Sequence, residues 1–154
     1  MTNFTTRYQP KPDELVLIEN AVATLPQAYA PYSGFHVAAA ILLNNGVIVT
    51  GTNQENAAYP AGMCAERVAL FTAASQYPGQ SIRKLVVVAR KAGAAELSPA
   101  TSCGSCRQVM LEFEHRQAHP FEVIMLEQPE SWLHAASAAV LLPFSFNKSN
   151  LSEP

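Results

Sequence analysis

All three cysteines of the chain lie in two short stretches that are far apart in the sequence. The first stretch holds Cys64, and the second holds Cys103 and Cys106. Two cysteines at this spacing can bind one metal ion from a single loop or helix start. If Cys64 binds the same ion, the fold must bring two distant segments together at one point. This requirement constrains the fold more than any other feature of the sequence.

Three thiolates and a nearby glutamate form a chemically specific combination. Three protein ligands leave one corner of a zinc tetrahedron open, and in catalytic zinc sites that corner holds water. Zinc lowers the pKa of such a water from about 15.7 to about 7, so hydroxide is available at neutral pH. Glu66 follows Cys64 by two residues, where its carboxylate can take that water's proton to a substrate. The sequence therefore predicts a catalytic site with one Zn²⁺ per chain.

These stretches resemble the zinc-dependent cytidine deaminase family, in its three-cysteine, homotetrameric form. Cys64 stands at the first ligand position of the family signature, and Cys103 and Cys106 form its C-x-x-C half. Further similar segments follow the family's order: residues 32–37 (YSGFHV), 53–57 (NQENA), 103–108 (CGSCRQ) and 141–146 (LLPFSF). The resemblance implies hydrolytic deamination of cytidine, deoxycytidine or both to uridine or deoxyuridine and ammonia, in pyrimidine salvage.

The resemblance also implies roles for other residues. Asn53 and Glu55 are expected to bind the ribose hydroxyls, for which an amide and a carboxylate are suitable partners. Phe35 is expected to form a wall of the base pocket, and Ala65 to contact the substrate. Tyr59 is expected to enter the pocket of a neighbouring subunit, as is Phe146.

The chain departs from the family pattern at two positions. Ser102 stands where the family usually has proline, which is expected to loosen the loop near the departing amine and to affect efficiency more than metal binding. Ala38 stands where glycine is frequent, and its methyl group is expected to leave less space for close packing against that strand.

Apolar patterns predict one α/β domain over residues 1–154, with a loose polar arm at residues 1–11. The expected architecture is a three-layer α/β/α sandwich around a mixed sheet of about five strands, with two parallel strand–helix–strand units. The predicted elements are a helix from residue 13, strands at 35–43, 47–49, 85–88 and 121–126, helices from near 64 and 103, and a helix in the Ala-rich part of 131–146.

This architecture places both helix starts at the carboxyl ends of strands, where open α/β sheets bind ligands. Helix N-termini favour thiolate over thiol because they carry partial positive charge. Three thiolates on Zn²⁺ leave a formal charge of −1, which a nearby cation would offset. Arg67 is the candidate for that cation, in contact with the cysteine sulfurs.

Composition excludes several partners. The net charge is −2 and the isoelectric point is about 6.1, without a basic stripe, so no nucleic-acid polymer is expected as a partner. The N-terminal residues lack the apolar run that is typical of a signal peptide, and no apolar run reaches the ~20 residues of a membrane span. An odd number of cysteines used for metal binding fits a cytoplasmic protein. A small-molecule nucleoside is the expected partner.

Other interpretations account for less of the sequence. Plain buried cysteines fit poorly with three of them at predicted helix starts, and a redox C-x-x-C leaves Cys64 and Glu66 unexplained. A non-catalytic zinc protein would need a fourth protein ligand. A relative acting on another aminopyrimidine or a nucleoside antibiotic is disfavoured by the presence of both Asn53 and Glu55, and a polynucleotide editor by the net charge.

Overall fold

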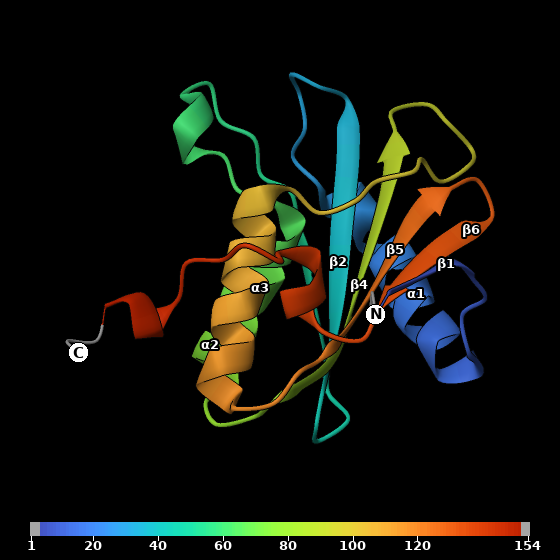
Figure 1. Cartoon of the computed structure of the whole chain (residues 1–154). Helices are drawn as coiled ribbons and strands as arrows, with labels where there is room; N and C mark the ends of the chain where they lie inside the picture. Colours follow the sequence, from blue (N-terminus) through green and yellow to red (C-terminus); the bar gives the residue numbers. More distant parts are fainter. Residues whose placement is uncertain (1–3, 152–154) are drawn as a thin grey trace.

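Six strands form one sheet that carries α1 on one face and α2 and α3 on the other (Figure 1). The computed structural model describes residues 4–151. In chain order the elements are β1 (Phe4–Tyr8), α1 (Pro12–Thr24), β2 (Phe35–Leu43), β3 (Ile48–Thr52), α2 (Ala65–Gln76), β4 (Ile82–Lys91), α3 (Gly104–Gln117), β5 (Glu122–Gln128) and β6 (Ser131–Ala135). Short 3₁₀ turns are η1 (Leu25–Gln27), η2 (Tyr59–Ala61), η3 (Ala138–Leu141) and η4 (Lys148–Asn150). The predicted three-layer α/β/α sandwich is confirmed.

The strand order places the starts of α2 and α3 together. The order is β1-β6-β5-β4-β2-β3, with β4 and β5 as parallel neighbours. Both β3 and β4 run antiparallel to β2, which lies between them, so β3 and β4 are parallel to each other. The units β3–α2–β4 and β4–α3–β5 are therefore both parallel, as predicted. Each helix begins at the edge of the sheet where its preceding strand ends, which brings two distant segments together.

Three details of the predicted fold differ from the structure. The sheet has six strands where the sequence predicts about five. Residues 4–8, within the predicted loose arm, form β1, which pairs with β6 through Phe4 opposite Ala135. Four of the five β1 residues are exposed, so no alternating apolar pattern marks this edge strand. Residues 1–3 of the predicted arm lie outside the described residues.

The third difference concerns the predicted helix in residues 131–146. The first part of this segment is β6, which forms a hairpin with β5, and the Ala-rich part contains only the short turn η3. Buried Ala135 and Ala138 pack in the core beside α3. Ala135 pairs with Val123 of β5, and the carboxylate of Glu114 accepts hydrogen bonds from the Ser137 hydroxyl and the Ala138 amide. These tertiary contacts override the helix propensity of alanine in this part of the chain.

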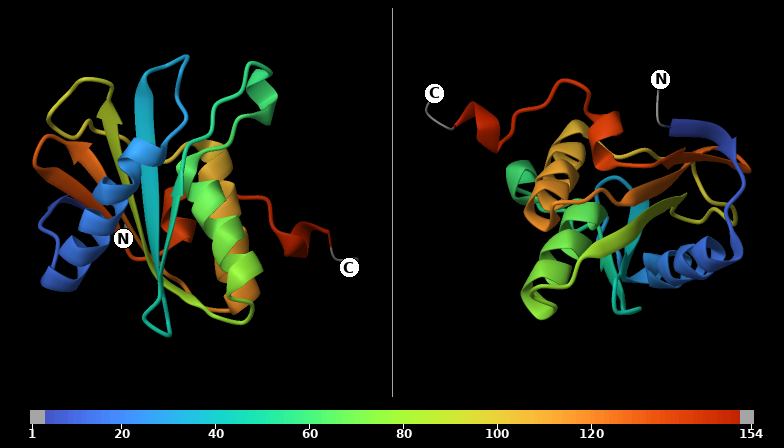
Figure 2. Two further views of the ribbon diagram at one scale, coloured as in Figure 1. Left: turned by 180° about the vertical axis from the view of Figure 1, so that it is seen from behind. Right: turned by 60° about the horizontal axis from the view of Figure 1, so that its bottom comes forward.

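The central strands are buried on both faces, which explains their continuous apolar sequence. On β2, Ala39 and Ile41 belong to the core under α2 and α3, whereas Ala38 and Ala40 belong to the core under α1. The left and right panels of Figure 2 show the two helical layers on opposite sides of the sheet. Ala38 is fully buried, so its methyl group lies within the α1 core.

Close packing fixes the position of α2. A Cβ atom built on Gly51 of β3 would overlap the backbone nitrogen of Ala69 and lie 2.8 Å from the carbonyl oxygen of Ala65. Only glycine allows the two backbones to approach this closely. Gly51 thus sets how deeply the start of α2 sits against the sheet. No helix within residues 4–151 combines the length and the apolar character needed to span a bilayer.

Candidate active site

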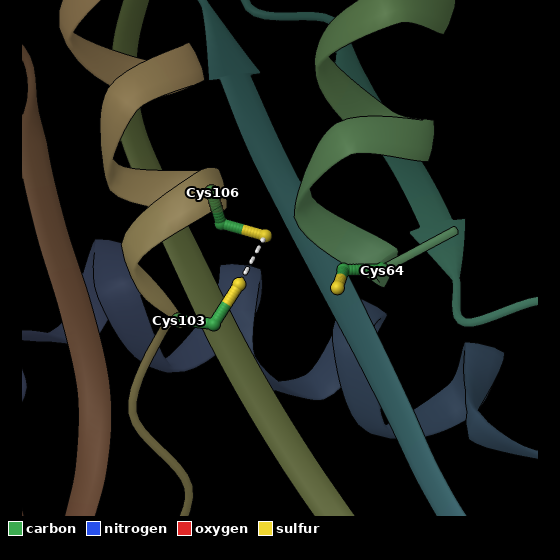
Figure 3. Close-up of side chains that lie close together, drawn as sticks. All are labelled: Cys64, Cys103 and Cys106. Atoms are coloured by element: carbon green, nitrogen blue, oxygen red, sulfur yellow. Dashed lines mark hydrogen bonds between the residues drawn. The ribbon is translucent and has the colours of Figure 1, made fainter. Parts of the chain in front are cut away.

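The three cysteine sulfurs meet where α2 and α3 begin (Figure 3). Cys64 is the residue directly before α2, Cys103 is the residue directly before α3, and Cys106 lies in the first turn of α3. All three Sγ atoms lie within 4.8 Å of one another, and those of Cys103 and Cys106 are 3.5 Å apart. Tetrahedral zinc with Zn–S bonds of about 2.3 Å holds its sulfurs roughly 3.8 Å apart. The donor set therefore fits one zinc ion.

No second group of three or more metal-ligating side chains occurs within residues 4–151. The four histidines of the chain lie outside this group. Cys106 is buried, Cys64 is half-buried and Cys103 is exposed. The three sulfurs thus run from the protein interior toward its surface.

Arg67 contacts the cluster from the first turn of α2. Its Nη2 donates a hydrogen bond of 3.5 Å to the Sγ of Cys64. A hydrogen bond from Cys106, and then the Arg67 guanidinium, hold the pKa of the Cys64 thiol well below its usual value. The same contact with Cys64, together with burial, raises the pKa of Cys106. The environment thus favours negative charge on Cys64, as a metal ligand requires.

Glu66 lies in the first turn of α2 and is only 4% exposed. Burial raises the pKa of its carboxyl group above the ordinary value. Glu66 lines the same cavity as Cys64 and Cys103. A buried carboxyl group in such a position is suited to exchanging protons with a bound molecule.

A cavity of about 660 Å³ opens above the cysteines, a size typical of small-molecule sites. Its wall combines the turn before β2, the segment after β3, the start of α2 and the loop before α3. Among its lining residues are Phe35, Asn53, Glu55, Tyr59, Cys64, Ala65, Glu66, Arg67 and Cys103. The structure thus brings together the residues predicted to bind substrate, move protons or balance charge, with the exception of Phe146. Cys106 is buried at the sulfur cluster.

Asn53 joins the end of β3 to the start of β2. Its Oδ1 accepts a hydrogen bond from the amide of Val37 at 2.8 Å, and its Nδ2 donates to the carbonyl oxygen of Phe35 at 2.9 Å. An amide side chain has two acceptor positions and two N–H groups. Asn53 therefore keeps one acceptor position and one N–H group for another molecule.

Glu55 is bound to the turn before β2. The hydroxyl of Ser33 donates to its Oε1 at 2.5 Å, and the amides of Tyr32 and Ser33 donate to its Oε2 at 2.9 and 3.3 Å. These hydrogen bonds, that of the Ser33 hydroxyl first, hold the pKa of Glu55 below its ordinary value. The carboxylate is therefore ionised at neutral pH and can accept further hydrogen bonds.

Tyr59 lies in η2, on a segment that projects beyond the sheet (green in Figure 1). Its side chain is 78% exposed, and its ring meets that of Tyr32 edge-on at 6.4 Å. Phe146 is also exposed, on the C-terminal segment. It does not line the cavity of its own chain.

Ser102 is nearly fully buried, and its polar groups have partners. Its amide and its hydroxyl lie 3.2 and 3.4 Å from the Sδ of Met125, and its carbonyl oxygen accepts a hydrogen bond from Arg107. These contacts hold the residue that stands in place of proline. The sequence analysis assigned no role to Ser33 or Arg107, although both lie in the segments that carried the resemblance. Their hydrogen bonds to distant backbone and side-chain atoms have no signature in the sequence.

Comparisons with known proteins agree with this geometry. Residues 12–119 match the family model described as the cytidine and deoxycytidylate deaminase zinc-binding region. A cytidine deaminase of Sporosarcina psychrophila is 39% identical over 136 residues, which cover 88% of this chain and 93% of that protein. The crystal structure of a Burkholderia pseudomallei cytidine deaminase has a TM-score of 0.70 and 40% identity, covering 86% of this chain and 98% of that one. That of Mycobacterium tuberculosis has a TM-score of 0.69 and 31% identity, covering 89% and 99%.

Proposed function

The chain belongs to the cytidine and deoxycytidylate deaminase family, and we propose that it converts cytidine, deoxycytidine or both to uridine or deoxyuridine and ammonia. The observation that carries the proposal is that three cysteine sulfurs converge at a cavity whose lining residues include Cys64, Cys103 and the buried Glu66. Zinc, when bound by Cys64, Cys103 and Cys106, lowers the pKa of water enough to supply hydroxide at neutral pH.

Glu66 moves the protons of the reaction. Its carboxylate accepts a proton from the attacking water and delivers it to N3 of the pyrimidine, while the water oxygen bonds to C4. Glu66 then takes the second proton of that oxygen to the exocyclic amino group. The C4–N bond breaks, ammonia leaves, and C4 keeps the oxygen as a carbonyl. Burial of Glu66 supports this role because a raised pKa brings the carboxyl group closer to the working pH.

The remaining lining residues bind and orient the nucleoside. Phe35 flanks the base, Ala65 contacts it, and Asn53 and Glu55 bind ribose hydroxyls through their unused hydrogen-bonding positions. None of these residues is assigned to the 2′-hydroxyl alone, so the proposal covers cytidine, deoxycytidine or both. Arg67 offsets the negative charge of the three thiolates through its contact with Cys64.

The subunits assemble as a homotetramer in this proposal. The exposed Tyr59 and the exposed aromatic side chains of Phe144 and Phe146 support it, because they are not covered within their own chain. Tyr59 of one subunit then completes the pocket of a neighbour. Free cysteine thiols fit a reducing compartment such as the cytoplasm. The proposed enzyme acts in pyrimidine salvage. The proposal treats residues 1–154 as a single domain.

One assay set tests the function. Purified protein is analysed for zinc and is given cytidine, deoxycytidine and a cytosine-containing single-stranded oligonucleotide, with ammonia release as the readout. We expect about one zinc per chain on the three-ligand model, activity on the free nucleosides and none on the oligonucleotide. Full activity in a zinc-free preparation would contradict the proposal, and so would activity on the oligonucleotide alone.

A further inference from the structure

Arg107 connects the loop in front of Cys103 to the C-terminal part of the chain. Its Nε donates a hydrogen bond of 2.8 Å to the carbonyl oxygen of Ser102, and its Nη1 donates one of 3.3 Å to that of Leu141. Ser102 is 3% exposed and directly precedes Cys103. A buried carbonyl group needs a partner, and Arg107 provides one for Ser102. One guanidinium group thus links two segments that are distant in sequence.

Helix α3 also holds the rest of the C-terminal segment, defined here as residues 137–146. The buried carboxylate of Glu114 accepts hydrogen bonds from the amide of Ala138 at 2.7 Å and the hydroxyl of Ser137 at 2.8 Å. Gln108 donates to the carbonyl oxygen of Phe146 at 2.7 Å. The segment passes alongside α3 in both figures that show it (red in Figures 1 and 2). It is therefore attached to the helix that carries Cys106 and begins directly after Cys103.

We propose that Arg107 is a positioning residue that fixes Cys103 at the metal centre by bracing the Ser102 carbonyl against the C-terminal segment. The proposal deepens the zinc site proposed above and rests on it. Cys103 is the exposed member of the cysteine cluster and lies outside the body of α3. Its carbonyl oxygen accepts a hydrogen bond from the backbone amide of Arg107 at 3.0 Å, and on its other side it is joined to Ser102, whose carbonyl oxygen the Arg107 side chain binds.

The chemistry of arginine suits this role. A guanidinium group is planar, and its N–H groups point in fixed directions, so that Nε and Nη1 can reach two separate carbonyl oxygens at once. Lysine has the same charge on a single freely rotating ammonium group. If Arg107 acts through the fixed directions of its N–H groups, lysine cannot replace it. If only a positive charge were needed at this position, lysine could replace it.

The first test measures zinc retention. Holoprotein is mixed with a chromophoric chelator, and the rate of zinc transfer is compared for wild type, Arg107→Gln, Arg107→Lys and a control, Arg83→Gln. Arg83 is an exposed arginine at the start of β4. We expect Arg107→Gln to release zinc roughly 10- to 100-fold faster, the range found when groups supporting metal ligands are removed. Arg107→Lys should restore only part of the retention, and Arg83→Gln should match wild type.

Hydrogen exchange gives a readout that does not depend on bound metal. Amides of residues 100–104 should exchange faster in Arg107→Gln, while those of β4 should not change. If Arg107→Gln does not fold, Arg107→Lys is compared with Arg83→Lys in the same two measurements. Zinc release within twofold of wild type, with unchanged exchange at residues 100–104, would overturn the proposal. Wild-type protein without zinc would instead refute the proposed function and leave the exchange result to decide on Arg107.

A double-mutant comparison tests the link to the C-terminal segment. Ser137→Ala removes the hydroxyl that donates to Glu114 and also accepts from the amide of Ala139 at the start of η3. We expect Ser137→Ala to speed zinc release in wild type but to add little in the Arg107→Gln background, because the brace is already absent. No effect in wild type, or the same factor in both backgrounds, would show that the C-terminal segment plays no part.

Discussion

The hydroxyl of Ser33 donates a 2.5 Å hydrogen bond to the carboxylate of Glu55. The same hydroxyl accepts a hydrogen bond from the amide of Phe35 at 3.0 Å. Glu55 is proposed to bind the ribose and Phe35 to flank the base. One small side chain therefore sets the spacing between the two halves of the proposed nucleoside pocket.

Replacing Ser33 by alanine tests this relationship. We expect Ser33→Ala to raise KM for cytidine roughly 3- to 10-fold, as expected from the loss of one hydrogen bond that orders the site, with little change in kcat. Ser33→Thr retains a hydroxyl and serves as the matched control. Steady-state kinetics of the three proteins check the prediction. An unchanged KM in Ser33→Ala would show that the amides of residues 32 and 33 hold Glu55 without help.

Gly51 offers a test of how packing positions α2. The methyl group in Gly51→Ala would overlap the backbone of α2, and backbone atoms cannot rotate away. We expect a loss of about 1–3 kcal/mol in the free energy of unfolding, as for overpacked cores, measured by denaturant titration. Zinc affinity should fall as well, since Cys64 moves with the start of α2. Wild-type stability in this variant would mean that α2 can shift freely.

A buried ion network lies on the α1 side of the sheet. Glu14 is fully buried, with its carboxylate 2.6 Å from the Nζ of Lys84 and 2.7 Å from the hydroxyl of Tyr8. Lys84 also lies 3.3 Å from Asp13 and 3.5 Å from Glu122. Burial alone would raise the pKa of Glu14, but hydrogen bonds from Lys84, the Lys11 amide and Tyr8 outweigh it, and the pKa is lowered.

This lowered pKa predicts a pH dependence of stability. A carboxyl group whose pKa is lower in the folded state stabilises the fold above its unfolded pKa, and the contribution disappears as the pH falls through the folded pKa. The ordinary value is 4.5, so the contribution of Glu14 should be complete at pH 7 and decline below about pH 4.5. In Glu14→Gln we expect a loss of about 3 kcal/mol at pH 7, as when one partner of a buried pair is removed.

The measurement is urea denaturation of wild type and Glu14→Gln between pH 7 and pH 3. The difference in unfolding free energy between the two proteins should shrink as the pH falls. Taking the difference cancels the acid-induced loss of metal, which affects both proteins equally. A difference that stays constant over this range would show that Glu14 has the same pKa in the folded and unfolded states.

A cysteine variant tests metal binding and stability separately from proton transfer. Cys103→Ala removes one of the three sulfurs that would hold the metal between the start of α3 and the start of α2. Metal binding is coupled to folding, so we expect this variant to lose zinc and thermal stability together. Metal analysis and thermal unfolding of the same preparation check this. Retention of one zinc per chain would contradict the assignment of Cys103 as a ligand.

The parts of the fold that the sequence predicts are those with strong local signals. The apolar run of β4 and the order of strands and helices suffice to place the starts of α2 and α3 at one edge of the sheet. β1 escapes prediction because its stability comes from backbone pairing with β6, while most of its side chains are exposed. β6 escapes prediction because its pairing with β5 decides its structure, and alanine propensity does not.

The same division applies to the candidate site. The sequence predicts the roles of Cys64, Glu66 and the C-x-x-C pair because their spacing along the chain reflects their chemistry. Ser33 and Arg107 act through hydrogen bonds to partners that are distant in sequence. Only the folded chain shows which atoms those partners are, so no local pattern predicts either role.

The role of Glu66 is the central claim, and Glu66→Gln tests it most directly. Glutamine keeps the shape and the hydrogen-bonding reach of glutamate but cannot carry a proton. The measurement is kcat for cytidine in Glu66→Gln protein whose zinc content has been determined in the same preparation. We predict a full complement of zinc and a fall in kcat of at least roughly 10²–10⁴-fold, the range for general acid–base catalysis. Turnover within a few-fold of wild type, with zinc bound, would contradict the proposed mechanism.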